Sequence, residues 1–231
     1  MNPSGKPRAL VVLLENVGHI HSLNLPSWAR ALIDFVSEAY AKFILLVYGA
    51  HRAYGRVVIL EDEKANGTLL SETLLNLSRT HQVDVFLLVH GLNGGLVGYR
   101  GQLVAEETFA PLRAAYKADP AALDVRVVYG INCYGSSLVP TWQALGVQTV
   151  AGAKGVNWFP EPGLSSFLIP WLRGRSFKEA VSRSNKNVRR VGGRLLGVEH
   201  SAVRSSELRV YGEDITLQEG KPNETRPLLT R

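Results

Sequence analysis

Five short apolar runs recur along the chain, and helix-like segments separate them. The runs cover residues 8–14, 56–60, 83–90, 125–131 and 147–151. They are rich in Val, Leu and Ile, which is typical of strands that are buried on both faces of a sheet. A further strand is predicted within residues 207–217. Alternating strands and helices predict an α/β fold, a mostly parallel six-stranded sheet sandwiched between helices.

Apolar residues at helical spacing lie between these runs. One or two helices are predicted within residues 25–47. Residues 67–81 repeat leucine at helical spacing, with Thr68 or Ser71 placed to cap the helix. Residues 106–120 give the next helix. The connections are therefore βαβ crossovers, which are right-handed in nearly every known sheet.

A loop rich in glycine, proline and aromatic residues follows the fifth run and re-enters a helix near Leu164. Ser176 and Glu179 then form a capping box that opens another amphipathic helix. The basic face of this helix carries Lys178, Arg183, Lys186, Arg189 and Arg190. No aromatic residues interleave with these charges, so a solvated outer face is favoured over a nucleic-acid or acidic-lipid site.

Length and composition fit one domain over residues 1–231, with 218–231 as a flexible tail. The chain has 231 residues, 45% of them hydrophobic, and a net charge of +6, which demands no nucleic-acid partner. The N-terminal apolar run is too short for a signal-peptide core or a membrane span. We therefore expect a cytoplasmic protein with no membrane partner.

Two reactive side chains follow neighbouring predicted strands. His90 ends the run 83–90, and Cys133, the chain's single cysteine, follows the run 125–131 by two residues. Ligands bind open parallel sheets at the carboxyl ends of the strands. If these two strands are adjacent in the sheet, their ends lie about 5 Å apart, and the imidazole and the thiol face the same crevice. Because imidazole can take a thiol's proton during attack, the pair predicts a catalytic dyad.

Glycines follow both residues. Gly91, Gly94 and Gly95 allow a substrate backbone to approach closely. The backbone amides of Gly91 and Cys133 are predicted to form an oxyanion hole. A lone cysteine after an apolar strand is more often a core residue, and a lone histidine at a strand end is more often structural. Their occurrence together, each followed by glycine, favours catalysis.

The pattern strand-His-Gly followed by strand-x-x-Cys-x-Gly resembles the caspase-like cysteine peptidases, which include caspases, metacaspases, legumains, gingipains and CHAT-domain peptidases. The 43 residues from His90 to Cys133 are close to the roughly 50 of caspases. The resemblance extends from Arg8 to about Leu217. It implies a cysteine endopeptidase in which His90 is the general base and Cys133 the nucleophile, with a peptide or protein as substrate.

The resemblance also indicates where the substrate side chain would bind. Metacaspases carry an acidic residue two positions before the cysteine, whereas this chain has Ile131. The pocket is expected to draw on Glu15, after the first strand, and on Glu161, after the fifth, with Trp158 as a wall of the groove. Two carboxylates in a partly desolvated pocket would favour cleavage after Arg or Lys. The alternative interpretation, that Glu15 and Glu161 are solvated loop residues, is equally well supported.

Other chemistries find less support. No Gly-x-Ser-x-Gly elbow occurs, and the glycine-rich loop lacks the order and the lysine of a phosphate loop. The remaining histidines lack zinc-site spacing, so no metal and no cofactor are predicted. Two alternatives stay open: a caspase-like scaffold with an idle dyad that acts as an adaptor, and a flavodoxin-like nucleotide binder. Dimerisation and a regulatory protein partner also stay open.

Overall fold

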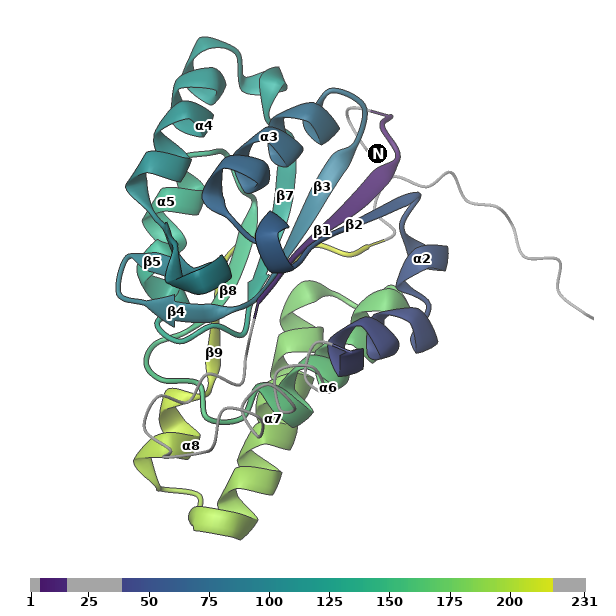
Figure 1. Ribbon diagram of the computed structural model, residues 1–231. Helices are drawn as coiled ribbons and strands as arrows, with labels where there is room; N and C mark the ends of the chain where they lie inside the picture. The colour runs from purple at the N-terminus through teal and green to yellow at the C-terminus, as the bar shows by residue number, and fades with distance from the viewer. Residues whose placement is uncertain (1–4, 16–38, 218–231) are drawn as a thin grey trace, which may run out of the picture.

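A six-stranded sheet forms the centre of the computed structural model, which describes residues 5–15 and 39–217 (Figure 1). The strand order is β2-β1-β3-β7-β8-β9. The strands are β1 (Arg8–Leu14), β2 (Arg56–Leu60), β3 (Gln82–Leu88), β7 (Val125–Gly130), β8 (Thr149–Ala153) and β9 (Leu208–Gly212). All neighbours pair in parallel except β9, which runs antiparallel to β8. The predicted fold class is therefore confirmed.

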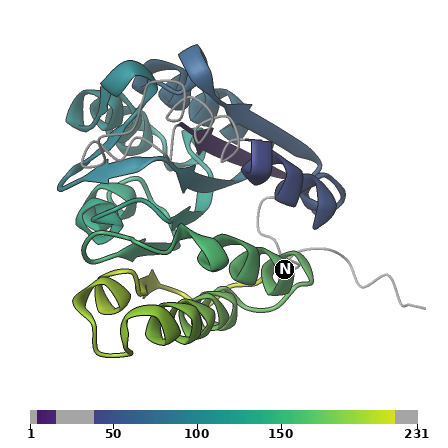
Figure 2. The same cartoon turned by 60° about the horizontal axis from the view of Figure 1, so that its bottom comes forward.

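Helices cover both faces of this sheet, as Figures 1 and 2 show. The described helices are residues 39–47, α2 (Ala50–Ala53), α3 (Gly67–Ser78), α4 (Glu106–Ala118), α5 (Val139–Gln143), α6 (Pro160–Leu172), α7 (Phe177–Leu196) and α8 (Ser201–Ser205). Short 3₁₀ helices lie at Asp62–Lys64 (η1), Tyr99–Gly101 (η2), Pro120–Ala122 (η3) and Gly135–Leu138 (η4). Helices α3, α4 and α5 share one hydrophobic core with the sheet, and residues 39–47 with α2, α6 and α7 share the other.

The two cores follow from the alternation of side chains along each strand. In β1, Ala9, Val11 and Leu13 face the α3–α4 core, while Leu10, Val12 and Leu14 face the α6–α7 core. Every residue of this strand is buried. Full burial of a Val or Leu side chain contributes about 1.5–3 kcal/mol, so the apolar runs of the sequence fix the middle of the sheet.

Most predicted elements lie where the sequence places them, with local corrections. The strand expected at 147–151 begins two residues later, at Thr149, because residues 144–148 form the turn that leaves α5. Asn66 caps α3, not Thr68 or Ser71: its side-chain oxygen accepts the Leu69 N–H at 2.9 Å. Of the helical segment predicted over 25–47, only residues 39–47 are described, and the predicted tail 218–231 lies outside the described residues.

The strand predicted over 83–90 is wrong at its end. Strand β3 stops at Leu88, and His90 opens a separate three-stranded antiparallel sheet of β4 (His90–Leu92), β5 (Gly95–Val97) and β6 (Leu103–Val104). A two-residue turn at Asn93 and Gly94 reverses the chain, and Gly94 has a φ of +81°. Asn-Gly is a strong hairpin signal, so this hairpin is readable in the sequence.

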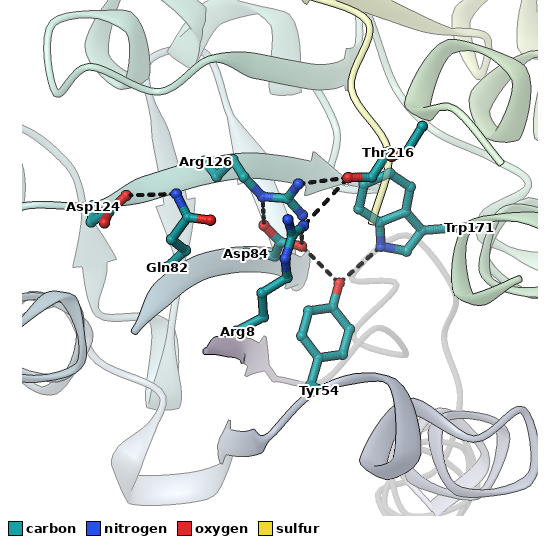
Figure 3. Close-up of polar contacts among 8 residues, drawn as sticks. All are labelled: Arg8, Tyr54, Gln82, Asp84, Asp124, Arg126, Trp171 and Thr216. Carbon is teal, nitrogen blue, oxygen red and sulfur yellow. Dashed lines mark hydrogen bonds and ion pairs between the residues drawn. The ribbon is translucent and has the colours of Figure 1, made fainter. Parts of the chain in front are cut away.

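A buried ion pair lies at the opposite, amino-terminal end of the strands (Figure 3). The Arg126 guanidinium donates to both oxygens of Asp84, at 3.0 and 2.7 Å, and also to the Thr216 carbonyl at 2.7 Å. Tyr54 donates to Asp84 at 2.9 Å and accepts the Trp171 indole N–H at 2.8 Å. Burial, reinforced by Asp84, raises the pKa of Tyr54 well above its usual value. This network ties α2, α6 and the segment after β9 to the sheet.

An irregularity between β3 and β7 makes the ion pair possible. Val83 lies opposite Val125 and Asp84 lies opposite Val127, so Arg126 is an extra residue in β7. Such a bulge breaks the strict alternation of faces. Arg126 therefore shares a face with Asp84, on the side of the sheet where its guanidinium lies over the Trp171 ring.

Candidate active site

The two candidate catalytic residues follow strands that are neighbours in the sheet. Strands β3 and β7 pair in parallel up to Leu87 and Gly130, and the Ile131 N–H donates to the Leu87 carbonyl at 3.2 Å. His90 and Cys133 therefore both follow the carboxyl ends of adjacent strands. Both are half-buried. The adjacency on which the expected dyad depends is present in the backbone.

Direct contacts join the loops that carry these residues. A β-carbon placed on Gly91 would lie 2.8 Å from the Asn132 amide nitrogen, 2.9 Å from the Cys133 carbonyl carbon, and closer still to the Cys133 carbonyl oxygen. The Gly94 N–H also donates to the Ser137 hydroxyl at 2.8 Å. Glycine at position 91 thus lets the chain after His90 pack directly on the backbone of Cys133.

The β4–β5 hairpin determines how the residues after His90 are presented. His90 lies opposite Val97, and Gly91 lies opposite Leu96. In an antiparallel ladder, hydrogen-bonded and non-hydrogen-bonded pairs alternate. Because the two-residue turn closes on Leu92 and Gly95, we infer that the Gly91 pair is of the non-hydrogen-bonded kind. Its N–H then points away from β5.

The sulfur of Cys133 accepts a hydrogen bond from a residue that the sequence did not single out. The Asn157 N–H, in the segment between β8 and α6, donates to Cys133 Sγ at 3.4 Å. The Asn157 side chain donates to the Ile131 carbonyl at 2.7 Å, and its oxygen accepts the Phe159 N–H at 3.1 Å. No motif marks an asparagine in such a loop, because its importance depends on a contact between distant parts of the chain.

A small cavity of about 80 Å³ lies beside these strand ends. It is lined by Tyr40, Ala41, Leu88, Ile131, Pro160, Glu161 and Leu164. Two of the residues expected to form the substrate pocket, Ile131 and Glu161, therefore share one cavity. Its remaining lining is largely apolar. Glu161 supplies the one carboxylate among the described lining residues.

Glu161 is a partly buried acid in this cavity. Burial raises the pKa of Glu161 above its usual value, and hydrogen bonds from Ser165 oppose the rise. The Ser165 N–H and hydroxyl donate to its two oxygens at 3.2 and 2.7 Å. Burial, followed by the charge of Glu161, also raises the pKa of Tyr40. A carboxylate held in this way attracts a cation more strongly than one in free solution.

The other two expected pocket residues lie nearby but do not line the cavity. Glu15 is buried at the end of β1, where its N–H donates to the Leu88 carbonyl at 3.3 Å. Trp158 has 59% of its surface exposed, and its N–H donates to the Ser206 hydroxyl at 2.8 Å. Trp158 directly follows Asn157, whose N–H contacts the cysteine sulfur.

Within residues 5–15 and 39–217, no group of three or more His, Cys, Asp or Glu side chains is arranged to hold a metal ion. In the same part of the chain, no helix is long and apolar enough to span a bilayer.

Comparison with known proteins places the fold. No family model and no curated protein sequence matches this chain. Among solved structures, it is similar to the Arg-specific cysteine proteinase gingipain R (RgpB), with a TM-score of 0.56, 12% identity and coverage of 92% of this chain and 47% of that one. A complex of the pro- and mature domains of RgpB from Porphyromonas gingivalis gives a TM-score of 0.55, 11% identity and coverage of 92% and 48%.

These similarities establish the architecture. The mostly parallel six-stranded sheet flanked by helices matches the caspase-like fold of gingipain. The chain spans about half the length of the solved chains that it matches.

Proposed function

We propose that this chain is a cysteine endopeptidase that uses Cys133 as nucleophile and His90 as general acid and base. The observation that carries the proposal is the packing of Gly91 on the backbone of Cys133, at the carboxyl ends of two paired strands. The fold shared with cysteine proteinases supports it. A reactive pair at this edge of a parallel sheet lies where such folds bind ligands.

The reaction would proceed by acyl transfer. The Cys133 sulfur attacks the peptide carbonyl carbon, a C–S bond forms, and the carbonyl electron pair moves to oxygen. His90 receives the thiol proton and delivers it to the leaving amine as the C–N bond breaks. Water then attacks the thioester with His90 as base, which releases the carboxylic acid and restores the thiol.

The backbone amides of Gly91 and Cys133 would stabilise the oxyanion. The register of the β4–β5 hairpin supports this role, since it directs the Gly91 N–H away from β5. Loss of one oxyanion donor typically lowers turnover by about 100- to 1000-fold. The absence of a side chain at position 91 keeps this amide close to the cysteine.

We further propose a preference for cleavage after a basic residue. The cavity that Ile131 lines is small, about 80 Å³, and Glu161 supplies a carboxylate in its wall. The Arg-specific gingipain R is a structural neighbour. Because burial raises the pKa of Glu161, the preference for Lys or Arg over a neutral residue should weaken as the pH falls and Glu161 takes up a proton.

Incubation of the purified protein with a fluorogenic peptide library tests the proposal. Cleavage by the wild type and none by Cys133→Ala or His90→Ala is expected, with His81→Ala as a matched control because His81 follows α3, at the other end of the sheet. Fastest release after Asp or a neutral residue would overturn the basic preference alone.

Thiol labelling separates an enzyme from an idle scaffold. Iodoacetamide should modify the wild type rapidly near pH 6 and His90→Ala slowly, because the thiolate is the reactive form. Labelling that requires prior unfolding, together with no cleavage of any peptide, would instead favour an interaction domain. A regulatory partner, a second copy of the chain and cytoplasmic location remain proposals.

A further inference from the structure

The structure assigns to Asn157 the role of a positioning residue, which fixes the Cys133 sulfur relative to the cavity wall at Ile131. This inference deepens the proposed function, since it rests on Cys133 being the nucleophile. Three hydrogen bonds of Asn157 carry it, and a second set of bonds holds its segment from the opposite side.

Asn157 uses its main chain and its side chain for different partners. Its N–H donates to Cys133 Sγ at 3.4 Å. Its side-chain nitrogen donates to the Ile131 carbonyl at 2.7 Å, and its side-chain oxygen accepts the Phe159 N–H at 3.1 Å. One residue therefore bonds to both ends of the tripeptide Ile131–Cys133. A shift of Asn157 would therefore move the N–H donor at the sulfur and, at the same time, the Ile131 residue that lines the cavity.

Helix α8 anchors the other side of this segment. The Ser205 hydroxyl donates to the Val156 carbonyl at 2.7 Å, and the Trp158 N–H donates to the Ser206 hydroxyl at 2.8 Å. Ser206 is itself 1% exposed and donates to the Ala202 carbonyl at 2.7 Å. The residues on either side of Asn157 are thus bonded to α8, while the Asn157 side chain bonds the same segment to Ile131.

The loop after β7 completes the restraint. The Tyr134 N–H donates to the Gly155 carbonyl at 2.8 Å. Asn157 and its flanking residues are therefore bonded to both the cysteine loop and α8. The main-chain N–H of Asn157 therefore meets the sulfur from a segment that is bonded on two sides.

The same segment also leads into the cavity. Pro160 and Glu161, which line it, follow Asn157 by three and four residues, and Ile131 is bonded to the Asn157 side chain. A side chain bound in the cavity and the sulfur are therefore aligned through Asn157. Loss of this alignment should lower kcat more than it raises KM, because the geometry matters most in the transition state.

Asn157→Ala and the matched control Asn185→Ala test the inference. Asn185 makes an equivalent pair of side-chain bonds, donating to the Leu208 carbonyl at 2.8 Å and accepting the Leu208 N–H at 2.9 Å. Both variants should lose a few degrees of Tm. Asn157→Ala keeps the main-chain N–H but loses the side-chain bonds to Ile131 and Phe159 that hold this N–H against the sulfur. Only this variant should therefore slow iodoacetamide labelling of Cys133 at pH 7, by about 3- to 10-fold, since each lost bond contributes about 1 kcal/mol.

Asn157→Asp provides a second variant in case the alanine variant fails to fold. It keeps the acceptor for Phe159 and loses the donor to Ile131, so labelling should again slow. On a cleaved peptide, Asn157→Ala should lower kcat about 10-fold with KM within about 2-fold. Labelling of the folded Asn157 variants at the rate of Asn185→Ala, or faster, overturns the inference. Labelling requires no turnover. A wild type that cleaves no peptide would therefore refute the proposed function, but the comparison of labelling rates would still test the positioning role of Asn157.

Discussion

Replacement of Gly91 by alanine is the sharpest test of the contact between the histidine and cysteine loops. The added β-carbon would lie 2.8 Å from the Asn132 amide nitrogen and 2.9 Å from the Cys133 carbonyl carbon, whereas ordinary van der Waals contact lies at 3.4–4 Å. The Cys133 carbonyl oxygen would be closer still, so two of the three colliding atoms are main chain and a simple rotamer change cannot relieve the clash. The backbone must retreat by more than about 0.5 Å, which is the difference between 2.9 and 3.4 Å for the carbonyl carbon alone.

Overpacking of this kind typically costs about 1–3 kcal/mol. For a chain of this size, 1 kcal/mol corresponds to roughly 2–4 °C in Tm, so Gly91→Ala should lower Tm by about 2–12 °C. The displaced Gly91 amide should also lower peptide turnover by about 100-fold or more, if it is an oxyanion donor. Differential scanning calorimetry and a fluorogenic peptide assay measure the two effects separately.

Gly94→Ala is the matched control in the same hairpin. Gly94 has a φ of +81° and no atom within 4 Å of an added β-carbon. Alanine there is strained by roughly 1–2 kcal/mol but does not press on Cys133, so turnover should stay within a few-fold of wild type. A Gly91→Ala variant with wild-type Tm and wild-type cysteine labelling would refute the packing on which the candidate site is built.

Four further substitutions, in three experiments, test the surrounding structure. Arg126→Met removes the guanidinium that donates to both oxygens of the fully buried Asp84, so the free energy of unfolding in urea should fall by about 3–5 kcal/mol; a wild-type midpoint would contradict this. Because burial raises the pKa of Glu161, its ionised form destabilises the fold, and Glu161→Gln should raise Tm at pH 7. This difference in Tm between the variant and the wild type should shrink as the pH falls through the raised pKa toward 4.5. A difference in Tm that does not change with pH would contradict the prediction. Asn66→Ala should cost about 1 kcal/mol and Thr68→Ala less than about 0.5 kcal/mol, and equal losses would show that the cap is misassigned.

The apolar runs predicted strands even where burial is incomplete, as in β2, of which only Leu60 is buried. Strands β1 and β2 begin and end where their apolar runs do. The end of β3 could not be predicted in this way. Val89 continues the apolar run, but the chain already turns there into the hairpin that begins at His90. The Asn93–Gly94 turn carried the missing signal, since it favours a hairpin over an open loop.

The candidate site was predictable only in part, for a physical reason. His90 and Cys133 combine reactive side chains with strand ends, so local pattern and fold class together brought them to one edge. Asn157 has no such signature, because its contacts with Cys133 and Ile131 join segments more than twenty residues apart. Arg126 was hidden for a related reason, since the bulge that turns it toward Asp84 is a property of strand pairing.

The central position of β1 has a consequence for how the protein is made. Its partners β2 and β3 begin only at residues 56 and 82. During translation, this seven-residue apolar strand leaves the ribosome with both hydrogen-bonding edges open, and unpaired strand edges are sites of aggregation. Until residue 88 has emerged, the edge of β1 that β3 covers stays open, so this is the stage of synthesis at which β1 can pair with another molecule.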